Sequence, residues 1–184
     1  MKKTKKIAIL TIIFVLIMHT ISFANTRHVT LDEYDPRTMT LEERSKWVDE
    51  NVPATYYSSY TSPISAFSAN GEWIYTSTKK SSVGPDQYTV GELTTRVKYT
   101  VNTSQYSVED WDTEIFRARS LSTYGILTDT NIDSFWVNEP GNYRIIYQAW
   151  FADPSGAYFI EHWYNLHGNG NYSLRVVDGG DSTR

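Results

Sequence analysis

The sequence of 184 residues lacks cysteine entirely and contains only six prolines. Without cysteine, there is no disulfide framework, no thiolate metal site, no cysteine nucleophile and no lipid-anchored cysteine. The glycine-rich motifs of nucleotide-binding loops and the GxSxG motif of serine hydrolases are also missing, and no internal repeat has a fixed period. The sequence therefore carries no catalytic motif, and it is informative mainly about fold class, compartment and surface.

The first 24 residues have the three parts of a secretory signal peptide. Met1–Lys6 is basic, Ile7–Met18 is an uncharged apolar run, and Ser22 and Ala24 are the small residues that a signal peptidase reads. The apolar run is short for a membrane span. We therefore expect cleavage after Ala24 and a secreted, extracellular protein of bacterial origin. The alternative is an uncleaved N-terminal anchor.

The formal charge of −4 combines 17 basic and 21 acidic residues that are unevenly distributed. Four of the lysines and none of the acidic residues lie in residues 1–24, so removing the signal peptide leaves 13 basic and 21 acidic residues and a charge of −8. Such an acidic chain is repelled by nucleic-acid phosphates and by anionic membranes. We expect no nucleic-acid partner and no stable membrane insertion.

Residues 25–55 differ from the remainder in being charged and poor in apolar residues. Thr40 and Glu43 have the spacing of a capping box, which predicts a short amphipathic helix over Leu41–Asn51. We expect this N-terminal helix to dock on the main body through Trp47. The alternative is a mobile arm.

From residue 56 to residue 178 the hydrophobic pattern has the period of a β-strand. Apolar and polar residues alternate over Leu93–Val101, Tyr143–Phe151 and Tyr172–Val176, whereas Ala157–Asn165 is apolar on both faces and should lie centrally. Turn sequences rich in proline, glycine and asparagine separate these segments. The pattern predicts an all-β domain, either a sandwich or a barrel.

One stretch resembles a known family. Pro140–Ala149, with the sequence PGNYRIIYQA, is followed by a hairpin and by the strand Tyr172–Val177. Together they are similar to the last strands of bacterial immunoglobulin-like extracellular domains. The resemblance implies an antiparallel β-sandwich, immunoglobulin-like in type, that is used for adhesion or binding. We accordingly predict a β-sandwich domain over 56–178, preceded by the N-terminal helix and followed by a disordered tail over 179–184.

Aromatic residues are the most unusual feature of the composition. All six tryptophans, all 14 tyrosines and five of the seven phenylalanines lie after residue 24. Aromatic side chains fill β cores, and exposed ones stack on sugar rings. The candidates for ligand binding are those on otherwise polar faces or in polar segments, unless a second sheet or the N-terminal segment covers them. They are Trp150, Trp163, Tyr56, Tyr57, Tyr60 and Trp111.

Three histidines remain after residue 24, and two of them flank one predicted hairpin. His162 and His167, with Glu161, would bind a metal ion or transfer protons if the hairpin brought them together. The alternative is an exposed strand histidine and an unrelated loop histidine. We include His162 among the candidate ligand-binding residues.

Carboxylates cluster around Trp111, where Glu109, Asp110, Asp112 and Glu114 form an acidic run. A glycoside hydrolase needs two carboxylates across the scissile bond, one of them with a raised pKa. This run, or Glu161 with a histidine, is the basis for a hydrolase hypothesis. A solvated acidic loop is the usual interpretation of such a sequence.

Oxygen ligands alternate at Asp129, Asn131 and Asp133 as they do in a calcium loop. The EF-hand pattern then fails, because Ser134 stands where glycine is needed and Pro140 where the bidentate glutamate belongs. We therefore expect no cofactor, with calcium at a site of another type as the alternative. An Asx-capped turn is the competing interpretation.

These observations favour a secreted bacterial β-sandwich protein that binds an extracellular ligand, either a cell-surface glycan or a protein. A carboxylate-dependent hydrolase is one alternative. The other is a toxin or antagonist that acts on membranes through the apolar segment Ala157–Asn165. The aromatic surface motivates the first hypothesis, the acidic clusters the second, and the apolar hairpin the third.

Overall fold

The structure, a computed structural model, describes residues 26–57, 74–76, 78–85, 88–138 and 141–181. The predicted signal peptide and Tyr60 lie outside these residues. Ten strands and one helix make up the described part, and the strands form two sheets. The all-β class that the sequence predicts is therefore confirmed.

Sheet A has six strands, with the order β1-β10-β9-β8-β7 and with β2 beside β1 on the same edge of β10. Strands β7 to β10 form a meander, in which each strand is antiparallel to the next. β1 runs parallel to β10. The bounds are β1 (Thr26–Thr30), β2 (Thr55–Tyr57), β7 (Ile126–Asn138), β8 (Asn142–Asp153), β9 (Gly156–His167) and β10 (Tyr172–Gly180).

Sheet B has four antiparallel strands built around β5, which pairs with β3 and β4 on one edge and with β6 on the other. Two register shifts interrupt the long β5–β6 ladder. The bounds are β3 (Ile74–Tyr75), β4 (Lys79–Val83), β5 (Gly91–Asn102) and β6 (Ser107–Ser120).

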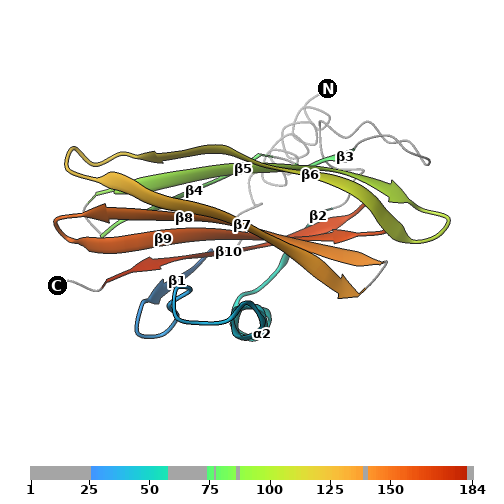
Figure 1. Cartoon of the computed structure of the whole chain (residues 1–184), viewed down its shortest axis with the longest axis horizontal. Coiled ribbons are helices and arrows are strands. Elements are labelled where there is room, and N and C mark those ends of the chain that lie inside the picture. Colours follow the sequence, from blue (N-terminus) through green and yellow to red (C-terminus); the bar gives the residue numbers. More distant parts are fainter. Residues whose placement is uncertain (1–25, 58–73, 77, 86–87, 139–140, 182–184) are drawn as a thin grey trace, which may run out of the picture.

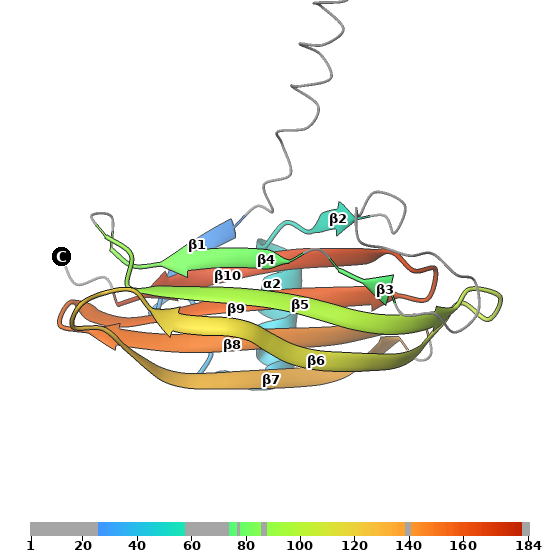
Figure 2. The same ribbon diagram turned by 90° about the horizontal axis from the view of Figure 1, so that it is seen from above.

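The two sheets face each other across one hydrophobic core (Figures 1 and 2). Alternate residues of each strand point into it, as the period of two requires. Val97 and Tyr99 enter from β5, Ile145 and Phe151 from β8, and Tyr164 from β9, and all five are fully buried. This core accounts for one face of each alternating segment seen in the sequence.

The other face of sheet A is covered by the N-terminal segment (Figure 1). Helix α2 (Leu41–Asn51) begins at Thr40, whose side chain and Glu43 form a complete capping box. Val48 of α2 packs in a second hydrophobic cluster with Ile146 and Trp163 of the sheet. Sheet A therefore lies between α2 and sheet B, and its strands β8, β9 and β10 are buried on both faces, whereas β7 is largely exposed.

Strand β9 shows this double burial most clearly, because it lies between β8 and β10 in the middle of sheet A. Its position confirms that Ala157–Asn165 is a central strand. The same position is inconsistent with a membrane-inserting hairpin formed by these residues, since their apolar side chains already pack in the two clusters. No helix among the described residues has the length and hydrophobicity needed to cross a membrane.

Candidate functional site

The two tryptophans expected on an open face of sheet A are covered by the N-terminal segment. Trp163 is 1% exposed, and the guanidinium groups of Arg44 and Arg144 each lie 5.6 Å from its ring centre. Trp150 is 6% exposed, and Arg37 lies 4.7 Å from its ring centre. The prediction of an exposed aromatic platform on this face is wrong, and its alternative, coverage by the N-terminal segment, describes the structure.

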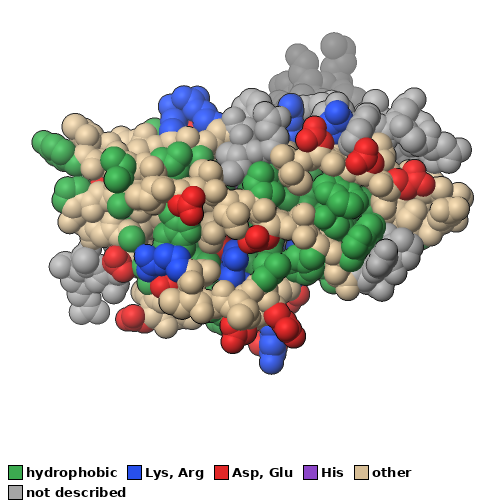
Figure 3. Space-filling model, viewed as in Figure 1, with side chains coloured by type: hydrophobic (Ala, Val, Ile, Leu, Met, Phe, Trp, Pro, Cys, Tyr) green, Lys and Arg blue, Asp and Glu red, His purple; other side chains and the backbone are tan. Residues whose placement is uncertain are grey.

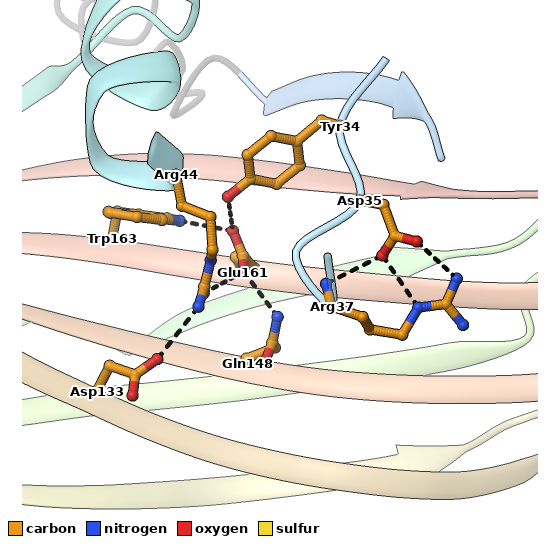
Figure 4. Close-up of polar contacts among 8 residues, drawn as sticks. All are labelled: Tyr34, Asp35, Arg37, Arg44, Asp133, Gln148, Glu161 and Trp163. Atoms are coloured by element: carbon orange, nitrogen blue, oxygen red, sulfur yellow. Dashed lines mark hydrogen bonds and ion pairs between the residues drawn. The ribbon is translucent and has the colours of Figure 1, made fainter. Parts of the chain in front are cut away.

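Beneath that segment, Glu161 is fully buried and accepts four hydrogen bonds (Figure 4). The donors are Tyr34 and Trp163 to one oxygen, at 2.7 and 2.8 Å, and Arg44 and Gln148 to the other, at 2.6 and 2.8 Å. Burial and the charge of Glu161 raise the pKa of Tyr34, so its phenol stays neutral and donates. With every donor supplied by the protein, this network anchors the segment to the sheet and leaves no place for a substrate.

His162 is fully buried in the core between the sheets. Its Nε2 lies 2.8 Å from the Ser81 hydroxyl, and its Nδ1 lies 2.6 Å from the Thr95 hydroxyl. Burial, with the charge of Lys79, lowers the pKa of His162 to about 3, so the ring is neutral. His167 is an odd number of residues further along β9 and so points to the opposite face. The predicted pairing of the two histidines at one site is therefore wrong.

Trp111 lies at the edge where β6 meets sheet A. Its ring stacks on Tyr143, with ring centres 3.7 Å apart, and meets Trp136 edge-on at 5.8 Å. Figure 3 shows hydrophobic side chains over this part of β6 and β7. Trp111 is thus half-buried in an aromatic cluster that joins the two sheets at their edge.

The carboxylates suggested for hydrolysis are not gathered at a pocket. Glu109, Asp110 and Asp112 are exposed on β6, and Glu161 is enclosed. None of these four residues is among the described residues that line the pockets of about 430, 460 and 500 Å³. These pockets therefore give the hydrolase hypothesis no support.

The predicted calcium ligands lie on a strand. Asp129, Asn131 and Asp133 are alternate residues of β7, about 6.6 Å apart along an extended chain. Asp133 accepts a hydrogen bond from Arg44. Among the described residues, no group of three or more His, Asp or Glu side chains converges as a metal site would require. The prediction of a calcium-binding loop at these three residues is therefore wrong.

Two of the predicted ligand-binding residues, Tyr56 and Tyr57, line a pocket of about 430 Å³ at one end of the molecule. We call it the tyrosine pocket. Tyr56 is 76% exposed and Tyr106 is 52% exposed, whereas Tyr57 stacks on Tyr172 with ring centres 4.8 Å apart. The described lining residues are Tyr56, Tyr57, Tyr106, His167, Asn169 and Asn171.

Three chain segments meet to form the tyrosine pocket: β2, the β5–β6 loop and the β9–β10 loop. Gly168 permits the two loops to touch, because a Cβ there would lie 2.2 Å from the backbone of Tyr106. Tyr99 donates a hydrogen bond of 2.6 Å to the Gly170 carbonyl and thereby ties the β9–β10 loop to sheet B. These contacts therefore hold the two loops of the pocket in fixed positions relative to the sheets.

Tyr106 adopts a left-handed backbone conformation, with φ of 54°. A non-glycine residue in this region has a backbone cost of about 1 kcal/mol, and such residues concentrate at functional sites. The conformation places an exposed aromatic side chain at the pocket. Nothing in the sequence singles out Tyr106, Asn169 or Asn171, because the approach of the two loops leaves no pattern within either loop.

His167 gives the tyrosine pocket its distinctive chemistry. Its Nδ1 lies 2.8 Å from the amide oxygen of Asn142, so Nδ1 carries the proton and Nε2 is an acceptor. Nε2 is buried and has no hydrogen-bond partner among the described residues. Burial lowers the pKa of His167, which keeps the ring neutral. The pocket is thus lined by aromatic rings, amides and a neutral imidazole whose acceptor nitrogen is buried.

Comparison with known proteins gives no identification. No protein-family model matches the chain, and no curated protein or solved structure shows significant similarity to it. The function must therefore be inferred from the pocket itself.

Proposed function

We propose that this chain is a secreted binding protein whose tyrosine pocket holds part of a neutral extracellular glycan. The observation that carries the proposal is the combination of exposed tyrosine rings, two asparagines and one neutral histidine in a single pocket. Ligand pockets of this kind pair apolar surface with a few polar groups that fix orientation. Tyr56 and Tyr106 supply faces on which a sugar ring can stack.

The amide side chains of the lining favour a ligand with hydroxyl groups. Sugar hydroxyls both donate and accept hydrogen bonds, as the amides of Asn169 and Asn171 do. Phosphates and carboxylates only accept hydrogen bonds, and they bring a negative charge. The described lining residues include no lysine or arginine to balance an anion. A neutral glycan therefore fits the pocket better than an anionic ligand or a nucleic acid.

The proposal includes two finer points of fold and compartment. The two facing sheets would belong to the β-sandwich class, and export would follow from the predicted signal peptide. Immunoglobulin-like sheets are joined by Greek-key connections, whereas β7 to β10 are neighbours in sequence order. Support for a binding role therefore comes from the tyrosine pocket and not from the immunoglobulin-like resemblance.

The test is binding to neutral polysaccharides, such as glucans, mannans and galactans, by affinity electrophoresis, followed by calorimetry on those that retard the protein. Tyr56→Ala and Tyr106→Ala should each weaken binding about tenfold, because loss of one stacking face costs on the order of 1–3 kcal/mol. Val137→Ala is the matched control, since Val137 is also exposed but lies outside the pocket.

Two outcomes would contradict the proposal. One is the absence of binding to every neutral polysaccharide tested. The other is binding that is as strong in Tyr56→Ala and Tyr106→Ala as in the control Val137→Ala. Circular dichroism of each variant establishes that the fold is intact, which is expected because both tyrosine side chains are largely in solvent.

A further inference from the structure

The end of the molecule opposite the tyrosine pocket is unusually apolar. Of eight large hydrophobic residues that are exposed in the described chain, five lie there, on or beside the loops that join β4 to β5 and β6 to β7. Figure 3 shows hydrophobic side chains at this end, at the left of the view. We call it the apolar end, and its five residues are Tyr88, Leu121, Tyr124, Ile126 and Leu127.

A pocket of about 460 Å³ opens among the loops of the apolar end. Tyr88, Leu121 and Tyr124 line it together with Asp153 and Pro154 from the β8–β9 loop. The loops brace each other, because the amide of Leu121 donates a hydrogen bond of 2.7 Å to the carbonyl of Val90. The pocket is thus shaped by three loops from both sheets.

Asp153 provides a negative charge without a cationic partner. No ion pair of the described residues includes it, and no lysine or arginine is among the described lining residues. Burial works against its ionisation, but hydrogen bonds from Ser155, Tyr88 and Ser122 outweigh this effect and hold its pKa below the ordinary value. Asp153 is therefore an ionised carboxylate between tyrosines.

The hydrogen bonds around Asp153 restrict the kind of cation that fits. One oxygen accepts from the amide and the hydroxyl of Ser155, and the other accepts from Tyr88 at 3.0 Å; the side chain of Ser122 also donates to the carboxylate. A carboxylate has about four acceptor positions, so these four donors occupy it. A cation that needs no hydrogen bond, such as a quaternary ammonium, is still attracted by the charge of Asp153 and by the faces of the tyrosine rings.

We propose that the apolar end docks on the surface of a membrane rich in choline phospholipid, with the trimethylammonium group held by Tyr88, Tyr124 and Asp153. Leu121, Ile126 and Leu127 would then lie among the headgroups and upper acyl chains, where apolar and aromatic side chains are favoured. Residues 25–184 carry a formal charge of −8, which opposes anionic membranes and leaves zwitterionic ones accessible. This inference is independent of the tyrosine pocket.

The test is co-sedimentation of residues 25–184, which contain every described helix and strand, with liposomes of pure phosphatidylcholine. Binding should be strong to these liposomes and weak to liposomes of phosphatidylethanolamine with phosphatidylglycerol. Tyr124→Ala and Asp153→Asn should each lower the partition coefficient about tenfold, through loss of a cation–π contact or of the charge. Soluble phosphocholine should compete.

Val137→Ala is again the matched control, because it removes an exposed apolar side chain at a distance from the apolar end. Equal binding to liposomes with and without choline would overturn the proposal, as would full binding by both Tyr124→Ala and Asp153→Asn. Binding of soluble phosphocholine without sedimentation would also overturn it, since the ligand would then be a choline group outside a bilayer. Tyr124 is 79% exposed, so its variant tests the site even if Asp153→Asn weakens the loop.

Discussion

At the scale of single residues, the buried charged side chains between α2 and sheet A are the ones whose substitution should cost the most stability. Glu161 and Arg44 form an ion pair of 2.6 Å, with the two side chains 0% and 7% exposed. A buried pair of this kind adds little over a hydrophobic equivalent, but the loss of one partner strands the other in a poorly solvated site. The pair therefore holds the N-terminal segment against the sheet.

Glu161→Leu should lower the free energy of unfolding by about 3–5 kcal/mol, because it leaves the buried Arg44 with only its longer contact to Asp133 and leaves the donors on Tyr34 and Trp163 unpaired. Urea denaturation measures this change. Glu33→Gln, which breaks an exposed pair with Arg27, is the control and should cost less than about 1 kcal/mol. Equal costs for the two variants would refute the assignment of Glu161 as the anchor.

The burial of Trp163 changes how its substitution must be interpreted. Trp163→Ala removes a fully enclosed side chain, and such a change costs on the order of 3–5 kcal/mol. A loss of binding in this variant would therefore report unfolding. Exposed residues such as Tyr56 and Tyr124 are the informative positions for ligand binding.

At the scale of elements, helix α2 is short and depends on its cap and its contacts. Arg144 donates hydrogen bonds to Ser45 and Asp49 of the helix, and Arg175 bonds to the Val52 carbonyl just beyond it. An isolated helix of this length would be marginal in water. Its stability is therefore a property of its contact with sheet A.

Thr40→Ala should lower the free energy of unfolding by about 1 kcal/mol, since it removes the side chain that accepts the Glu43 amide hydrogen bond at the start of α2. The amides of α2 should exchange faster with solvent in this variant. The amides of sheet A beneath the helix should also exchange faster, but by a smaller factor. Glu50→Ala, an exposed change near the other end of the helix, is the control. Exchange that is unchanged throughout α2 would contradict this role of the cap.

At the scale of the whole molecule, the two ends differ in chemistry. The tyrosine pocket has a neutral lining, while the pocket at the apolar end holds the Asp153 carboxylate. Both are formed by loops at opposite ends of the facing sheets, as Figure 1 shows for the loops. The rigid core between them keeps the two surfaces apart, so that each can be changed without the other.

Acid should destabilise the folded protein as a whole. The pKa values of His162 and His167 are lowered mainly by burial, so the unfolded chain takes up protons first as the pH falls below about 6.5. The stabilisation present above that pH is lost progressively towards pH 3, where His162 titrates in the folded state. Asp178, whose pKa is raised by burial, acts in the opposite direction.

Urea unfolding between about pH 4.5 and pH 7.5 measures this dependence. His162→Gln retains polar atoms near Ser81 and Thr95 but does not titrate, so its stability should vary less with pH than that of the parent chain. An identical pH dependence in both proteins would show that His162 is not the group responsible.

The amino-acid sequence by itself determined the all-β class, the central position of β9 and the capped start of α2. These follow from local periodicity and from residues only three apart, such as Thr40 and Glu43. It also singled out Tyr56 and Tyr57, because they are aromatic residues in a polar segment.

Only the tertiary structure decided which aromatic residues are open to a ligand. Trp150 and Trp163 alternate with polar residues just as exposed aromatics would, yet the N-terminal segment covers them. Tyr106 and Asp153 gain their roles from loops that are distant in sequence and meet at the ends of the sheets. Burial and pocket formation depend on such long-range contacts, and a single-sequence pattern records only the neighbours along the chain.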